Sequence, residues 1–143
     1  MTKQNNAVAL AGRILIAMLF LMSGLSKLGA PAATQGFIAS VGLPAPVLSY
    51  FGSMSVELIG SVLLIVGLRV RVVSAGMAVF TLLTAAFFHN HFADQDQVIH
   101  FLKNIAITGG LLQVAAFGPG KFSLDHRFSR SVKQPGSAIA ALG

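Results

Sequence analysis

The chain has 143 residues, of which 55% are apolar and only 10% are charged, and its formal net charge is +6. A soluble domain carries about 25% charged residues, so this composition excludes a water-facing globular domain and predicts an integral membrane protein. The sequence has no cysteine, which excludes disulfides, thiol catalysis and cysteine-ligated clusters within the chain.

Four apolar stretches are long enough to cross a bilayer. They cover residues 7–28, 46–68, 72–88 and 98–117, and a spanning helix needs about 20 residues. Strands in lipid would leave backbone groups without hydrogen-bond partners, so helices are the only reasonable interpretation. We therefore predict an all-α fold, an integral membrane four-helix transmembrane bundle, that occupies residues 1–118.

The connections between these stretches are short or polar. The first contains the amphipathic segment TQGFIASVG (34–42), which is too short to span and is expected at the interface as a turn or short helix. The second is only GLRVR, which predicts a tight hairpin, and the third is the polar HNHFADQDQ. Residues 119–143 form a basic tail whose end, PGSAIAALG, is expected to be disordered.

Basic residues predict the orientation in the membrane. If four helices alternate, one side receives Lys3, Arg69, Arg71, Lys121, Arg127, Arg130 and Lys133. The positive-inside rule then places both termini in the cytoplasm, which we expect for a multi-pass protein of a bacterial inner membrane. The basic tail is expected to meet anionic lipid headgroups, not nucleic acid. A cleaved signal peptide over the first stretch is the competing interpretation.

Three charged residues, Arg13, Glu57 and Lys103, fall well inside the predicted spans, and Lys27 lies at the end of the first span. A charge at the bilayer centre costs about 2.5–3.5 kcal/mol on insertion scales and usually faces the bundle interior. Glu57 is near the middle of its span, and each cation is about 8 Å away along the membrane normal. We therefore expect a network of these three side chains. Snorkelling of the two cations to the interfaces and a purely structural ion pair are the alternatives.

Histidines flank the third connection. His89, His91 and His100 are weak candidates for metal or haem ligation, with Asp94 and Asp96 nearby. Their spacing matches no established metal signature, so polar histidines at the interface are the favoured interpretation, and neither haem nor metal is expected.

Three motifs together resemble the DoxX family of small four-helix membrane proteins. They are RILIAMLFLMSGLSKL (13–28), VELIGSVLLIVGLRVR (56–71) and FLKNIAITGGLL (101–112), in the family's order. The resemblance covers about residues 13–117. The matching positions are Arg13, Gly24, Lys27, Glu57, Gly60, Gly67, Lys103, Asn104 and Gly110.

The resemblance implies an interior polar site, formed by the charged residues and Asn104, with glycines that let the helices pack closely. Family members are associated with membrane redox systems, including quinone-linked and oxidative-stress complexes, and no catalytic residue set is carried over. The leading hypothesis is a non-catalytic or accessory membrane subunit of a redox or stress-response system. It would bind a quinone or a lipid at Arg13, Glu57 and Lys103, as a homo-oligomer or within a membrane complex. The alternatives are an assembly factor or scaffold with a structural polar interior, and a small oligomeric transporter or proton relay.

Overall fold

The structure is a computed structural model that describes residues 3–132, and within that range its only regular elements are six helices. The helices, in chain order, are α1 (Lys3–Gly29), α2 (Pro31–Ser40), α3 (Pro46–Val66), α4 (Val70–Phe88), α5 (Gln95–Phe117) and α6 (Leu124–Val132). Proline occupies the first turn of both α2 and α3, where a missing backbone N–H costs no helical hydrogen bond.

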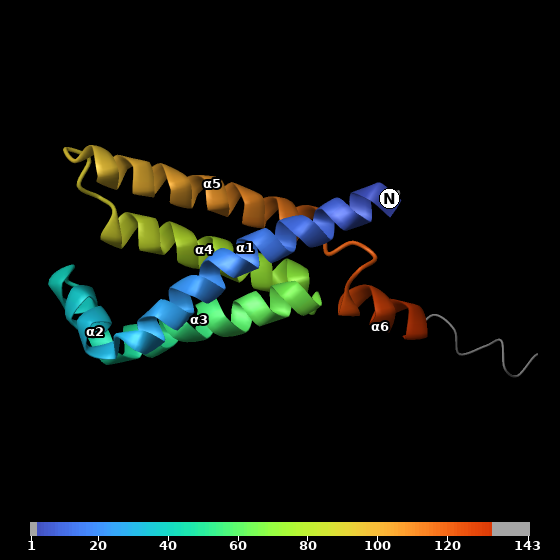
Figure 1. Cartoon of the computed structure of the whole chain (residues 1–143), viewed down its shortest axis with the longest axis horizontal. Coiled ribbons are helices and arrows are strands. Elements are labelled where there is room, and N and C mark those ends of the chain that lie inside the picture. The colour runs from blue at the N-terminus through green and yellow to red at the C-terminus, as the bar shows by residue number, and fades with distance from the viewer. Residues whose placement is uncertain (1–2, 133–143) are drawn as a thin grey trace, which may run out of the picture.

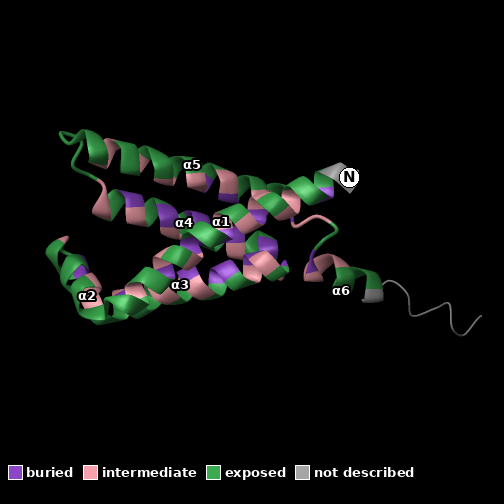
Figure 2. Ribbon diagram, viewed as in Figure 1, coloured by how far each residue is buried: buried purple, intermediate pink, exposed green. Residues whose placement is uncertain are grey.

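Four helices, α1, α3, α4 and α5, are long and apolar enough to cross a membrane, which confirms the predicted bundle. Many residues of these four helices are exposed (Figure 2), and many of the exposed side chains are leucine, valine, isoleucine or phenylalanine. Such a surface suits lipid, since a soluble protein would place large contiguous apolar areas inside. The short helix expected near residues 34–42 is also present, as α2.

The bundle consists of two helix pairs. Helix α1 packs against α3, and α4 packs against α5, whereas α1 and α5 make far fewer contacts. Figure 1 shows that the two pairs diverge towards α2 and come together at the opposite side, from which α6 extends. We call these two sides the α2 end and the α6 end. At the α2 end, α2 contacts the α4–α5 pair: the rings of Phe37 on α2 and Phe88 on α4 lie 5.3 Å apart.

Glycines set the distance between helices at three places. A Cβ at Gly24 would lie 2.6 Å from Leu58 Cδ2 on α3, and one at Gly60 would lie 2.8 Å from Met77 Sδ on α4. At Gly110 the neighbouring helix is α1: a Cβ there would lie 3.3 Å from Ile16 Cδ1. Helices in lipid associate through such close approaches, and the buried core cluster around Ala17, Leu64 and Leu111 adjoins them.

The turn from α3 to α4 depends on Gly67, whose φ of 77° is left-handed. Both Gly67 N–H and Leu68 N–H donate to the Leu63 carbonyl, at 2.9 and 3.0 Å, which ends α3 with the carbonyl acceptors satisfied. This turn gives the tight hairpin expected from GLRVR.

The tail begins with a helix that was not predicted. Helix α6 docks on the α3–α4 turn, where Asp125 N–H donates to the Gly67 carbonyl at 2.9 Å. The Asp125 carboxylate accepts from Arg69 N–H at 2.7 Å and Val70 N–H at 2.9 Å, so α6 caps the start of α4. The segment PGSAIAALG lies outside the described residues.

Candidate functional site

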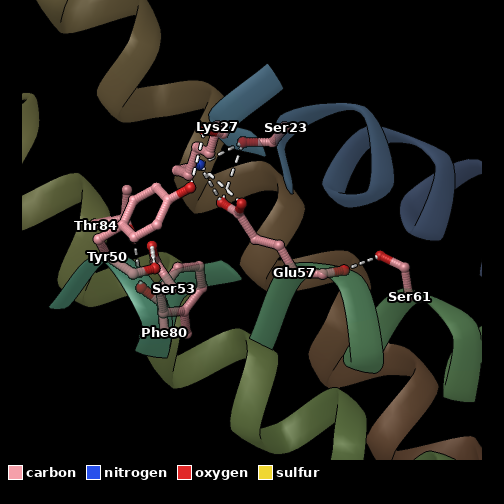
Figure 3. Close-up of polar contacts among 8 residues, drawn as sticks. All are labelled: Ser23, Lys27, Tyr50, Ser53, Glu57, Ser61, Phe80 and Thr84. Carbon is pink, nitrogen blue, oxygen red and sulfur yellow. Dashed lines mark hydrogen bonds and ion pairs between the residues drawn. The ribbon is translucent and has the colours of Figure 1, made fainter. Parts of the chain in front are cut away.

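An ion pair between Lys27 and Glu57 lies inside the bundle near the α2 end. The Lys27 ammonium is 2.7 Å from Glu57 Oε1 and 2.8 Å from Oε2. Ser23 joins the two charges, since Lys27 donates to Ser23 Oγ at 2.8 Å and Ser23 donates to Glu57 Oε1 at 3.1 Å. Figure 3 shows the three side chains converging from α1 and α3. The Glu57 side chain is only 6% exposed and that of Lys27 is 24% exposed.

Local sequence explains why these groups meet. Ser23 and Lys27 are one helical turn apart on α1 and therefore share a face, and Gly24 between them lets α3 come close. On α3, the Tyr50 hydroxyl donates to the Lys27 carbonyl at 3.1 Å and fixes the last turn of α1, where backbone carbonyls lack helical partners. Ser61 Oγ donates to the Glu57 backbone carbonyl, as Figure 3 also shows.

The expected network of Arg13, Glu57 and Lys103 is wrong in its contacts. Glu57 pairs with Lys27, and this is the one ion pair among the side chains that the structure describes. The physical reason is side-chain direction: helical side chains lean towards the helix N-terminus. Lys27, at the end of α1, therefore reaches back into the bundle to Glu57. The prediction compared the residues only by their depth along the membrane normal, and it did not allow for the direction in which a helical side chain extends.

Arg13 lies at the α6 end, where its side chain is buried and bonds to backbone carbonyls. It is 1% exposed, and its guanidinium donates to the Leu64 carbonyl at 3.1 Å and to the Phe122 carbonyl at 2.5 Å. Leu64 is in the last turn of α3, whose carbonyls need outside donors. A side chain at Gly67 would overlap this guanidinium and Ser123. Arg13 thus ties α1 to the end of α3 and to the start of the tail.

A cavity of about 610 Å³ opens between the two helix pairs at the α2 end. Lys27 and Glu57 line it from one side, and Lys103 and Asn104 line it from α5. Four of the five predicted polar site residues therefore share one cavity, and Arg13 is the exception. Most of the remaining wall is apolar, and it includes Leu19, Phe20, Phe37, Ile38, Phe80, Leu83, Phe87 and Ile107.

The polar groups of the cavity differ in whether they already have partners. Thr84 Oγ1 donates to its own helix at the Phe80 carbonyl, 2.9 Å away, and Asn104 Nδ2 donates to the His100 carbonyl at 3.1 Å. Lys103 is exposed, and its ammonium forms no hydrogen bond or ion pair with any other described residue. It is therefore the cation of this cavity that is available to a ligand.

Two of the three histidines reach the cavity. The rings of His89 and His100 stack at 5.1 Å with 18° between their planes, and both line the cavity wall. His89 Nδ1 is 3.0 Å from Gln97 Oε1. His91 is exposed and does not line the cavity. In the described part of the chain, no three histidine, aspartate or glutamate side chains come together as a metal site.

Sequence reasoning missed Ser23 and Tyr50. Ser23 had a usable signal, because it is a polar residue that precedes Lys27 by one helical turn in an apolar span. Tyr50 had none beyond its position near the start of the second span, since its contact with the Lys27 carbonyl depends on how α1 and α3 cross.

Comparisons with known proteins agree on one relationship. The sequence model of the DoxX family matches residues 8–90. The Inner membrane protein YqjF of Escherichia coli (strain K12) is 34% identical over 130 residues, covering 91% of this chain and 98% of that protein. The Inner membrane protein YphA of the same organism is 31% identical over 123 residues, covering 82% and 88% respectively. No solved structure matches the chain significantly.

Proposed function

This chain belongs to the DoxX family of integral membrane proteins, and we propose that it binds an amphipathic small molecule, a quinone or a lipid, in the cavity at the α2 end. In this proposal the protein is a non-catalytic accessory subunit of a membrane redox or oxidative-stress system. The ligand's polar head meets Lys103 and the Lys27–Glu57 pair, and its apolar body lies along the phenylalanine and leucine walls.

The observation that carries the proposal is the combination of an apolar cavity with one unpartnered cation. The volume of about 610 Å³ lies inside the range of about 300–1,000 Å³ typical of small-molecule sites. Such sites are mostly apolar, with a few polar groups that orient the ligand. Lys27 and Glu57 neutralise each other, so Lys103 leaves the cavity with an excess positive charge. A quinone carbonyl or an anionic lipid head supplies the acceptor that this charge lacks.

Lys103 provides the sharpest test, because its ammonium bonds to none of the side chains that the structure describes. We expect a short-chain ubiquinone analogue to raise the melting temperature of the purified protein, since a ligand at 100 times its Kd stabilises by about 2.7 kcal/mol. Lys103→Gln should leave the melting temperature of the ligand-free protein unchanged. It should weaken binding by about tenfold or more, the worth of a hydrogen bond to a charged group. The measurement is a thermal melt over a quinone titration.

Arg127→Gln is the matched control, since it removes the same charge from exposed α6, outside the cavity. The quinone half of the proposal fails if added quinone leaves the melting temperature of wild type unchanged. The lipid half fails as well if organic extracts of gently purified protein contain no lipid in fixed ratio to the chain. Equal loss of binding in both variants would show a general charge effect and would count against the site.

A scaffold or assembly role is the second candidate, and one observation favours it. Both Glu57 carboxylate oxygens already accept hydrogen bonds from Lys27 without any ligand, so the buried carboxylate needs no ligand to be satisfied. This function predicts that crosslinking in membranes captures a defined partner protein, and that Lys103→Gln does not reduce the yield of that crosslink. Capture that depends on Lys103 would argue for the ligand-binding role instead.

We also propose that the protein lies in a bacterial inner membrane with both termini in the cytoplasm. The two relatives are inner membrane proteins, and the basic residues gather at the α6 end, as the positive-inside rule requires. Because the chain has no cysteine, a single cysteine introduced at Ser129 reports the side by its accessibility to an impermeant thiol reagent. Labelling of this cysteine from the periplasmic side would show that the termini lie in the periplasm and would contradict the proposed orientation.

A further inference from the structure

A second hollow, of about 670 Å³, lies at the α6 end, away from the cavity described above. It is formed by the beginning of α1, the beginning of α4, the segment between α5 and α6, and α6 itself. Its basic lining residues are Arg69, Arg71, Lys121 and His126. These residues come from segments far apart in the sequence, and the docking of α6 on the α3–α4 turn brings them together.

The basic residues of this hollow outnumber its acidic residue. Asp125 is the acidic residue of its lining, and its carboxylate is occupied by the backbone N–H groups of Arg69 and Val70. It forms no ion pair with Arg69, Arg71 or Lys121, because the pair of Lys27 with Glu57 is the one ion pair of the described chain. The hollow therefore keeps an excess of positive charge, which suits an anion.

The Arg71 side chain packs against a glycine. Its guanidinium lies over Gly118, where a Cβ would be 3.3 Å from Arg71 Nε, and Gly118 has a left-handed φ of 81°. Lys121 is fixed through its backbone, since its N–H donates to Asn6 Oδ1 on α1 at 2.9 Å. The two cations are thus attached to different, firmly packed segments, while their side chains stay available to a ligand.

The surroundings favour a lipid over a free anion. Phe122 follows Lys121 directly and is 54% exposed, and Phe128 on α6 is 59% exposed. On α6, Leu124 and Phe128 are four residues apart and share one face, and Arg130 lies away from that face. Amphipathic helices of this kind lie in the membrane interface, with the apolar face towards the acyl chains. The cationic hollow suits the anionic headgroup of a phospholipid, and the exposed phenylalanines beside it suit the acyl chains.

We propose that this hollow binds the phosphate-bearing headgroup of an anionic phospholipid, with Arg71 and Lys121 contacting the headgroup and Phe122 and Phe128 contacting the acyl region. Juxtamembrane cations attract anionic lipids, and basic pockets between transmembrane helices hold their headgroups. The bound lipid would hold α6 at the membrane surface. This inference does not depend on the ligand of the α2-end cavity, because no residue lines both.

Native mass spectrometry of the full chain, released from detergent with equal amounts of phosphatidylglycerol and phosphatidylcholine, tests the proposal. We expect wild type to retain phosphatidylglycerol preferentially. Each of the variants Arg71→Gln and Lys121→Gln should weaken that retention by about fivefold, the contribution of one cation near an anionic membrane surface. Equal retention of the two lipids by wild type would overturn the proposal.

Arg130→Gln is the matched control, because it removes one charge from exposed α6 without lining the hollow. It should leave phosphatidylglycerol retention within twofold of wild type. An equal loss in Arg130→Gln would mean diffuse attraction to a basic surface and would contradict a defined site. Inorganic phosphate at millimolar concentration should not displace the lipid; displacement would identify a free-anion site and remove the lipid from the proposal.

Discussion

The pairing of Glu57 with Lys27 is the residue-scale feature on which the α2-end cavity depends. Both charges are placed by α1 and α3, and Ser23 connects them. Removing one member of a buried pair leaves an uncompensated charge, whereas replacing both with apolar residues of similar size is often tolerated. The pair therefore couples the geometry of the cavity to the stability of the α1–α3 contact.

Lys27→Met should lower the free energy of unfolding by about 3 kcal/mol, the lower end of the range for breaking a buried pair, because the Lys27 side chain keeps 24% exposure. The double variant Lys27→Met with Glu57→Leu should recover most of that loss. An SDS titration followed by circular dichroism measures both. If the double variant is less stable than Lys27→Met alone, Glu57 has other partners that matter more than Lys27.

At the scale of elements, α6 is held by Asp125, which caps α4 from outside the bundle. Asp125→Ala removes both carboxylate acceptors at the start of α4, and losing such a cap costs about 1 kcal/mol. We expect α6 to undock more often and trypsin to cleave after Arg127 about fivefold faster. Gel analysis of limited proteolysis in detergent measures the rate.

Asp96→Ala is the control for this variant. Asp96 is an exposed acid in the first turn of α5, at the opposite end of the bundle, and its loss should leave cleavage after Arg127 unchanged. Cleavage that is as slow in Asp125→Ala as in wild type would show that Arg13, through its bond to the Phe122 carbonyl, holds the tail without help from the cap.

The elements were predictable from sequence where the signal is local. Four spanning helices follow from the length and polarity of apolar stretches, and the turn at Gly67 follows from a glycine between two such stretches. Helix α6 was missed, because a short amphipathic segment beside a basic tail reads as surface chain. Its signal is Ser123, whose Oγ accepts from His126 N–H at 3.2 Å as an N-cap residue does.

At the scale of the whole molecule, sequence identified the site residues better than their contacts. Lys27, Glu57, Lys103 and Asn104 were singled out, and all four line the α2-end cavity. The partner of Glu57 was wrong, because pairing depends on helix rotation and on side-chain direction, which no residue pattern states. The assignment of Arg13 to the same network failed for the same reason: it lies at the other end, bonded to backbone carbonyls.

The divergence of the two helix pairs towards the α2 end (Figure 1) gives the molecule its asymmetry. One end is closed by the core around Leu64 and by the α3–α4 turn, and the other is open and spanned by α2. The Phe37–Phe88 contact joins α2 to the far pair across this opening. An amphipathic ligand entering from the lipid would therefore reach Lys103 and the Lys27–Glu57 pair at the α2 end.

Photolabelling with a quinone that carries a photoreactive tail tests the ligand site most directly. Irradiation of the purified chain, followed by peptide mapping, should place adducts on lining residues such as Phe87 and His100. An excess of unlabelled quinone should abolish them, and Lys103→Gln should reduce them. Adducts spread over lipid-facing residues such as Leu15 and Leu112, unaffected by competitor, would contradict a binding cavity between the helix pairs.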